Sequence, residues 1–260
     1  MVTLYFTLTG LFGLVIGSFL NVVIYRLPRQ KSFVVGRSIC PHCSSQLKWY
    51  HNIPVVSYLA LRGKCGFCRK PISWRYPLVE SVNSLLWVFL LLQSGLNWSF
   101  VVYCVTASLL IVVFFIDLDF RIIPDVLTLP GIVLGLAVSF LPHGLGFVNS
   151  LLGVLVGGGA LYLIAILGDW LFKKESMGGG DIKLAAMLGS LVGWQKILLI
   201  FMASAVIGIV ISGLMMLISA RLRQERIVPF GPFLALAALL AMVYGDRIIH
   251  FYVHTILALP

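Results

Sequence analysis

The chain has 260 residues, of which 60% are hydrophobic and only 11% charged, and its mean hydropathy is +1.03. A soluble domain needs about a quarter of its residues charged to cover its surface, so the composition excludes a soluble globular protein. The formal net charge of +10 fits the cationic loops of a membrane protein and calls for no nucleic-acid partner. The sequence therefore predicts an all-α polytopic membrane protein.

Eight apolar runs are candidate transmembrane helices. The first, residues 2–25, can span about 30 Å of hydrocarbon and lacks the pattern of a cleaved signal peptide. The others cover 78–96, 99–118, 126–142, 147–168, 182–194, 197–219 and 230–246. The run at 182–194 is short, so we expect it to be tilted or to cross only part of the bilayer. The chain then divides into a first transmembrane helix at 1–25, a polar loop domain at 26–77 and a membrane domain at 78–260.

Lysine and arginine residues predict the orientation. Ten of the nineteen lie between Arg26 and Arg75, and no acidic residue precedes Glu80. Because cationic loops stay in the cytoplasm, we expect this segment there, attracted to anionic membrane lipids. Alternation of the eight spans places six more cations on the same side: Arg121, Lys173, Lys174, Arg221, Arg223 and Arg226.

Two Cys-x-x-Cys motifs stand in the polar segment, "CPHC" and "CGFC". Four thiolates from two such motifs can surround a structural zinc ion tetrahedrally. A loop of this size buries little core of its own, and a metal would supply folding energy that it lacks. Disulfides are the alternative, which the reducing cytoplasm disfavours. We therefore predict a zinc site formed by Cys40, Cys43, Cys65 and Cys68.

Four aspartates lie at the ends of apolar runs. Asp117, Asp119 and Asp125 belong to the stretch "FIDLDFRIIPD", and Asp181 follows three glycines. An ionisable group in a membrane segment is costly and indicates function. Two facing carboxylates tend to share one proton, so one can activate water while the other protonates a scissile carbonyl, as in aspartic proteases. The alternatives are structural: Asp125 and Asp181 can cap helices, and Asp119 can be solvated or ion-paired.

Glycines accompany these acids. Gly178, Gly179 and Gly180 leave the backbone before Asp181 free of side chains, and Gly231 does the same in "VPFGPF". We expect an extended substrate segment to bind along these backbone edges as an added strand. The alternative is that both stretches only begin helices.

Six stretches together suggest a family. They are "GSFLNVVIYRLP" (17–28), "NIPVVSYLALRGKC" (52–65), "ISWRYPLVE" (72–80), "IDLDFRIIPDVLTLP" (116–130), "GGGDIKLAAMLGSLVGW" (178–194) and "VPFGPFLALAAL" (228–239). With the two cysteine motifs, and in this order over nearly the whole chain, they resemble the type IV prepilin peptidases, also called leader peptidase/N-methyltransferases.

The resemblance implies an integral aspartic endopeptidase of the Gly-x-Gly-Asp kind in the bacterial inner membrane. Such enzymes cleave the basic leader of prepilins or pseudopilins after a glycine at the cytoplasmic face. They then methylate the new N-terminal residue with S-adenosylmethionine. Carried onto this sequence, the resemblance assigns catalysis to Asp117 and Asp181 and zinc binding to the four cysteines, and it makes 78–260 the transmembrane aspartic protease domain.

The site of methyl transfer is harder to predict. The sequence has no glycine-rich fingerprint for S-adenosylmethionine. Glu80, a lone acid just inside the second span, is our candidate for that cofactor-binding site. Its alternative interpretation is a polar residue neutralised by Arg75 or by an interhelical hydrogen bond.

Two other classes of protein fit parts of this pattern. A transporter would use glycine-interrupted helices and intramembrane acids to bind an ion, although transporters place such acids near the midplane. A membrane scaffold would use the cysteine loop to bind partners, and its acids would only cap helices.

Overall fold

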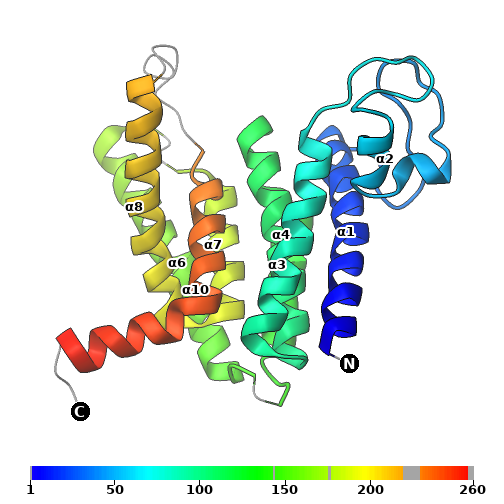
Figure 1. Ribbon diagram of the computed structural model, residues 1–260. Coiled ribbons are helices and arrows are strands. Elements are labelled where there is room, and N and C mark those ends of the chain that lie inside the picture. Colours follow the sequence, from blue (N-terminus) through cyan, green and yellow to red (C-terminus); the bar gives the residue numbers. More distant parts are fainter. Residues whose placement is uncertain (1, 143, 175–176, 219–228, 257–260) are drawn as a thin grey trace. The chain divides into compact units, whose positions relative to one another are not determined.

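The computed structural model describes residues 2–142, 144–174, 177–218 and 229–256 of the chain (Figure 1). Its internal contacts divide the chain into two compact units, one ending at Val112 and the other beginning at Val113. The division falls within a single long helix, α4 (Trp98–Phe120). Each unit is a bundle of helices, and α4 contributes its first part to one unit and its last part to the other.

The first unit pairs two long helices and carries the cysteine loop. Its elements are α1 (Val2–Arg26), the short α2 (Val56–Ala60), α3 (Arg75–Ser94) and the part of α4 up to Val112. Side-chain amides and hydroxyls join α3 to α1: Asn83 Nδ2 donates to the Gly13 carbonyl at 2.8 Å, and Ser84 Oγ donates to the Gly10 carbonyl at 2.8 Å. Such interhelical hydrogen bonds are a usual means of association in lipid.

The second unit is built around α7. Its elements are the rest of α4, α5 (Asp125–Val138), α6 (Phe147–Phe172), α7 (Gly179–Val192), α8 (Trp194–Ile218) and α10 (Gly231–Phe251), followed by a π-helical turn at Tyr252–Ile256. Helix α7 packs against α5, α6, α8 and α10. A side chain at Gly153 or at Gly189 would strike the backbone of the other glycine, so these residues allow α6 and α7 to approach closely. The buried part of α7 runs from Leu184 to Val192.

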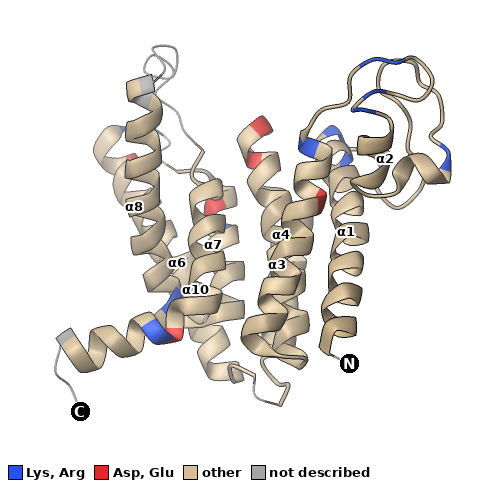
Figure 2. Ribbon diagram, in the orientation of Figure 1, with Lys and Arg blue, Asp and Glu red and all other residues tan. Residues whose placement is uncertain are grey.

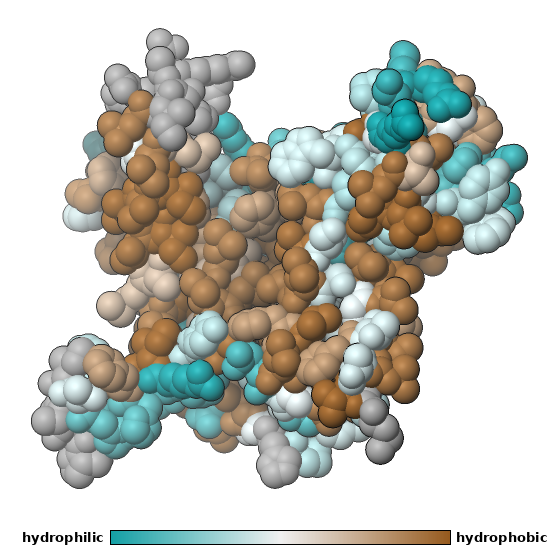
Figure 3. Space-filling view, viewed as in Figure 1, coloured by the Kyte–Doolittle hydropathy of each residue, from teal (hydrophilic) through white to brown (hydrophobic). Residues whose placement is uncertain are grey.

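The predicted helical membrane fold is confirmed, but the count of eight spans is not. Six helices of the described residues are long and apolar enough to cross a membrane: α1, α3, α4, α6, α8 and α10. Helices α5 and α7 have 14 residues each, which gives about 21 Å at 1.5 Å per residue, less than the roughly 30 Å of hydrocarbon. The apolar pattern did not reveal that α5 ends at Val138 rather than at residue 142. Apolar side chains cover the sides of the long helices (Figure 3).

The cationic residues keep the predicted grouping in the first unit. Figure 2 shows lysine and arginine positions spread over the loop between α1 and α3. Arg26 also has a structural part, because its guanidinium donates to the carbonyls of Ser32, Val35 and Arg37 within the loop. Arg221, Arg223 and Arg226, which we expected on the same side, lie outside the described residues.

Candidate functional site

Asp117 lies in the last turn of α4, after a run of buried apolar residues. Its side chain is 5% exposed, and Ile116 before it is fully buried. The backbone N–H of Gly231, the first residue of α10, donates a hydrogen bond to Asp117 Oδ2 at 3.1 Å. A carboxyl group is thus held inside the second unit by the end of another helix.

Asp181 lies in the first turn of α7. The helix begins after Gly178, and the Asp181 backbone N–H donates to the Gly178 carbonyl at 3.1 Å. The side-chain atom Oδ1 is buried and has no hydrogen-bond partner among the residues that the structure describes. A capping carboxylate would accept a bond from a nearby backbone N–H, so this oxygen does not fit the capping alternative.

The structure brings Asp117 and Asp181 near each other in the second unit. Their carboxyl groups are close enough to interact electrostatically. Ile123, in the connection between α4 and α5, lies close to the first turns of both α7 and α10. A Cβ atom on Gly180 would stand 2.9 Å from Ile123 Cβ, and one on Gly231 would stand 3.1 Å from Ile123 Cδ1. One isoleucine therefore spaces the N-termini of α7 and α10 around the two acids.

The other two acids of the predicted cluster are placed differently. Asp119 is exposed in the last turn of α4, which continues to Phe120, so it is helical rather than part of the following turn. Asp125 begins α5 and forms an ion pair with Lys183 of α7. Asp117 is thus the acid of this group that is both buried and close to Asp181.

The four glycines do not form the extended edges that we expected. Gly179 and Gly180 belong to the first turn of α7, and Gly231 to the first turn of α10, so all three are helical. Only Gly178 is extended, with φ −69° and ψ 136°. The extended backbone is missing at these three glycines because the helices begin there, and the binding of a substrate along the glycines stays a prediction. Gly178 and Gly179 are nevertheless exposed, and a Cβ on Gly179 would meet no atom within 4 Å.

The four cysteines of the loop converge as predicted. Their sulfur atoms all lie within 4.8 Å of one another, and Cys40 Sγ is 3.9 Å from Cys68 Sγ. All four are free thiols, so the disulfide alternative is not what the structure shows. A tetrahedral zinc ion with Zn–S bonds of about 2.3 Å separates its sulfur ligands by about 3.8 Å. The donor set and its spacing therefore fit a zinc ion.

The two cysteine motifs have the same local backbone. In each, a residue after the second cysteine donates its N–H to the carbonyl of the first: Ser44 to Cys40 at 2.9 Å, and Arg69 to Cys65 at 3.0 Å. Both Ser44 and Arg69 have positive φ angles, 56° and 59°. Isolated antiparallel bridges close the two turns, Ile39 with Gln46 and Lys64 with Pro71. The two cysteine motifs thus form turns of the same kind, as expected if each turn supplies two ligands to one metal ion.

The thiols influence one another's ionisation. Hydrogen bonds to Ser45 lower the pKa of the Cys43 thiol to about 6, and backbone hydrogen bonds from Cys68 and Phe67 lower the pKa of Cys65. For Cys68 a backbone hydrogen bond from Lys70 acts in the same direction, but burial and the neighbouring thiols outweigh it and raise the pKa to about 11. Without a cation among them, thiols at this spacing cannot all ionise.

Glu80 lies in α3 and holds the loop. Its side chain is 7% exposed, Oε2 accepts a hydrogen bond from the Val55 N–H at 2.8 Å, and Ser18 of α1 is a second partner. Val55 precedes α2 with φ +60°, a conformation that a β-branched residue rarely adopts. These contacts match the hydrogen-bonded interpretation of Glu80, and its part in methyl transfer stays a prediction.

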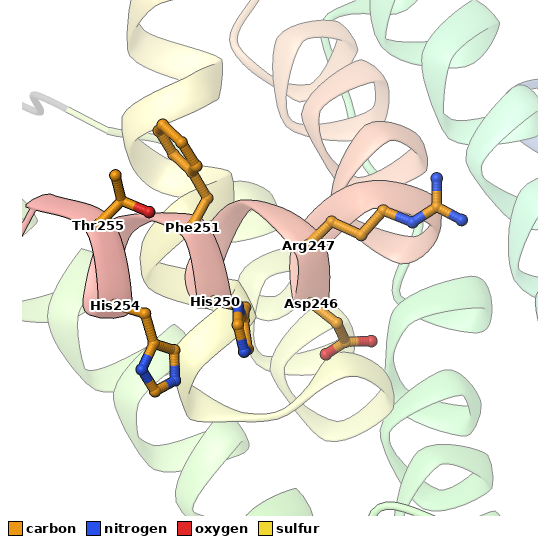
Figure 4. A pocket seen from close by; sticks show the side chains of 6 residues that line it. All are labelled: Asp246, Arg247, His250, Phe251, His254 and Thr255. Atoms are coloured by element: carbon orange, nitrogen blue, oxygen red, sulfur yellow. The ribbon is translucent and has the colours of Figure 1, made fainter. Parts of the chain in front are cut away.

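A shallow hollow lies at the other end of α10 from the acids (Figure 4). It is lined by Asp246, Arg247, His250, Phe251, His254 and Thr255. Asp246 forms an ion pair with Lys196 at 2.8 Å, and the ring centroids of His250 and His254 lie 4.2 Å apart with the rings tilted by 40°. Gly231 and Asp246 are separated by about four helical turns, so this hollow is not part of the carboxyl pair.

Three residues near the acids have contacts that the sequence did not indicate. Gly231, which we predicted as a substrate contact, donates its N–H to Asp117. Ile123 gave no signal, because one isoleucine in an apolar chain is unremarkable in sequence. Lys183 could have been found, since a lysine two residues after Asp181 is the only basic residue between Lys174 and Lys196.

The fold and the site together define a class: a multi-pass helical membrane protein with two interacting carboxyl groups and a separate cluster of four thiols. Family comparison agrees. The bacterial peptidase A24 N-terminal domain matches residues 11–94, which contain the four cysteines and Glu80. The type IV leader peptidase family matches residues 104–213, which contain Asp117 and Asp181.

Curated relatives match almost end to end. A protein of Aeromonas hydrophila is 39% identical over 277 residues, covering 96% of this chain and 94% of its own length. Proteins of Pseudomonas aeruginosa (36% identity, 94% and 92% covered) and Legionella pneumophila (35%, 95% and 94%) are similar. All three are named prepilin leader peptidase/N-methyltransferase. No solved structure matches the chain significantly. The chain belongs to the type IV leader peptidase family and is an enzyme.

Proposed function

We propose that this protein removes the leader peptide of type IV prepilins or pseudopilins after a glycine and then N-methylates the new N-terminal residue. The observation that carries the proposal is the pair formed by the buried Asp117 and the half-buried Asp181, which interact electrostatically within one unit. The printed names of the relatives, which cover more than nine-tenths of the chain, support both activities.

In the proposed cleavage the two carboxyl groups share one proton. The ionised group takes a proton from water, whose oxygen attacks the scissile carbonyl carbon, while the protonated group gives its proton to the carbonyl oxygen. The tetrahedral diol collapses when the first group passes the acquired proton to the amide nitrogen and the second regains one from a hydroxyl. Two carboxylates held together out of water favour this singly protonated state, because both cannot ionise cheaply.

The proposed approach of the substrate is from the side of Gly178 and Gly179. Both residues are exposed, and Gly179 has open space where a side chain would stand. Asp181, whose buried Oδ1 has no hydrogen-bond partner among the described residues, follows these two glycines by three and two residues. A peptide passing the two glycines would meet this oxygen without displacing another hydrogen bond.

Cys40, Cys43, Cys65 and Cys68 would hold a structural zinc ion. Bound there, zinc would neutralise the thiolates and fix the loop between α1 and α3, supplying folding energy rather than a reactive group. S-adenosylmethionine, which the relatives' name implies for methyl transfer, is proposed as the second cofactor.

We place the enzyme in the bacterial inner membrane with its peptidase site at the cytoplasmic face. The support is the loop 26–77, whose many cations and absence of acids suit the cytoplasmic side. Its proposed partners are the prepilin or pseudopilin substrate and anionic membrane lipids.

The test is an assay of the purified enzyme with a prepilin and S-adenosylmethionine, read by mass spectrometry. Wild-type protein should release the leader and add one methyl group to the product. Asp117→Asn and Asp181→Asn should each lower cleavage by about a thousandfold or more, as loss of a catalytic group does, whereas Asp119→Asn should cleave normally. Normal processing by Asp181→Asn would exclude the mechanism. Ion flux that depends on these acids, without cleavage, would indicate the transporter alternative.

A further inference from the structure

The N-terminus of α10 ends against Asp117. Gly231 is the first residue of this 21-residue helix, and its N–H is one of the donors that have no partner within the helix. That N–H points to Asp117 Oδ2 at 3.1 Å. The positive end of the helix dipole lies in the same place. A carboxyl oxygen of the proposed pair is therefore bound by a fixed backbone donor.

Position 231 has room for no side chain. A Cβ there would lie 2.6 Å from Asp117 Oδ2 and 3.1 Å from Ile123 Cδ1. The first distance is shorter than real Cβ contacts, so either the carboxyl group or the helix end would have to move. Glycine is needed here to let the backbone N–H come within hydrogen-bond reach of Asp117.

The two acids differ in their partners. Asp117 Oδ2 accepts the Gly231 bond, whereas Asp181 Oδ1 is buried with no protein partner in the described chain. A bond donated to a charged oxygen is stronger than one donated to a neutral oxygen. The backbone donor therefore suits a carboxylate at Asp117, and the unpartnered oxygen of Asp181 suits a group that gives its proton to the substrate.

We propose that Gly231 is a positioning residue of the peptidase: its N–H fixes the Asp117 carboxylate as the general base that activates water, which leaves Asp181 as the acid. This proposal rests on the proposed function, since it assigns roles within that carboxyl pair. In the cleavage step Asp117 takes the proton of the attacking water and later gives it to the amide nitrogen. Asp181 protonates the carbonyl oxygen and regains its proton as the diol collapses.

Gly231→Ala tests the proposal. The added methyl group should displace the carboxylate and lower kcat for cleavage about a hundredfold, the effect of misplacing a catalytic group by roughly 1 Å. KM should stay within about twofold, because Gly231 does not touch the substrate in this proposal. Methylation of a leaderless pilin should continue at the wild-type rate, which shows that the protein is folded.

Gly159→Ala and Gly213→Ala are the matched controls. Both glycines lie inside helices of the same unit, and a Cβ at either would meet no atom within 4 Å. Both variants should cleave at the wild-type rate. An inactive Asp117→Asn together with a fully active Gly231→Ala would overturn the positioning role and leave the proposed function intact. An active Asp117→Asn would instead refute the pairing of Asp117 with Asp181, on which the positioning role of Gly231 also rests.

A second measurement reports on the same bond without changing position 231. Asp117→Ala removes the acceptor, so amide hydrogen exchange at Gly231 in the full-length protein should become faster than in the wild type. The readout is local, because Pro232 has no amide hydrogen. Unchanged exchange at Gly231 would show that Asp117 does not hold this helix end, and would overturn the proposal even if Gly231→Ala failed to fold.

Discussion

Lys183 Nζ donates to both carboxylate oxygens of Asp125, at 2.8 and 2.7 Å, and joins the first turns of α7 and α5. The pair fixes the start of α7, where Asp181 stands, relative to the connection that carries Ile123. The ion pair also engages the carboxylate of Asp125, the acid of "IIPD". Sequence alone does not show whether Asp125 or Asp117 is the catalytic acid. Two neighbouring acids thus have different surroundings, one ion-paired and half exposed, the other buried.

The ion pair predicts a mild phenotype for Asp125. The side chains of Lys183 and Asp125 are 41% and 52% exposed, and exposed pairs contribute about 0–1 kcal/mol. Asp125→Asn should therefore keep cleavage within about tenfold of wild type and lower the melting temperature slightly. Lys183→Met should behave in the same way, because it breaks the same pair. Both are measured by the prepilin assay and a thermal melt in detergent. An inactive Asp125→Asn beside an active Asp117→Asn would show that Asp125 is the catalytic partner of Asp181.

Metal content is the second prediction. The purified protein should carry about one zinc ion per chain, since four thiolates complete a structural site. Cys40→Ser should lower that content and make the loop 26–77 sensitive to trypsin, because the loop contains many lysine and arginine residues at which trypsin cleaves. Elemental analysis and limited proteolysis measure the two effects. Cys104→Ala is the control, because Cys104 is buried in α4 outside the cluster, and its zinc content should equal that of the wild type. A zinc-free wild-type preparation, purified under reducing conditions, would refute the site.

Gly179 and Gly180 should respond differently to the same substitution. Gly180→Val should lower both stability and cleavage, because its Cβ would stand 2.9 Å from Ile123 Cβ. The contact with Ile123 therefore makes the stability of the protein sensitive to a side chain at this position. Gly179→Val meets open space, so its melting temperature should stay within a few degrees of wild type, while KM for a prepilin should rise if substrate passes there. An unchanged KM would place the substrate elsewhere.

The parts of the site that sequence predicted are those with a local signature. Each Cys-x-x-Cys motif defines its own turn, so the cluster of four thiols followed from spacing alone. The pair Asp117 and Asp181 needed the resemblance to a family, because several acids shared the same motif. The hydrogen bond from Gly231 to Asp117 joins residues 114 apart in sequence and uses a backbone donor, which no residue pattern displays. The predicted length of α5 was wrong for a similar reason. The apolar residues continue past Val138, but the chain turns there and the helix ends.

The last prediction concerns the anchor between the loop and the helices of the first unit. Glu80→Ala would leave the half-buried Val55 N–H without its acceptor, and the loss of such a hydrogen bond costs about 1 kcal/mol. Because Val55 is held at φ +60° by this bond and by α2, we expect the turn to relax and loop 26–77 to be cut faster by trypsin. The melting temperature should fall, and cleavage of a prepilin should be reduced less than methylation. Glu80→Gln is the matched control: its amide oxygen can accept the same hydrogen bond, so stability and trypsin resistance should be largely restored. If Glu80→Gln is stable and resistant to trypsin but cannot methylate a leaderless pilin, the carboxylate takes part in methyl transfer, and Glu80 is more than an anchor.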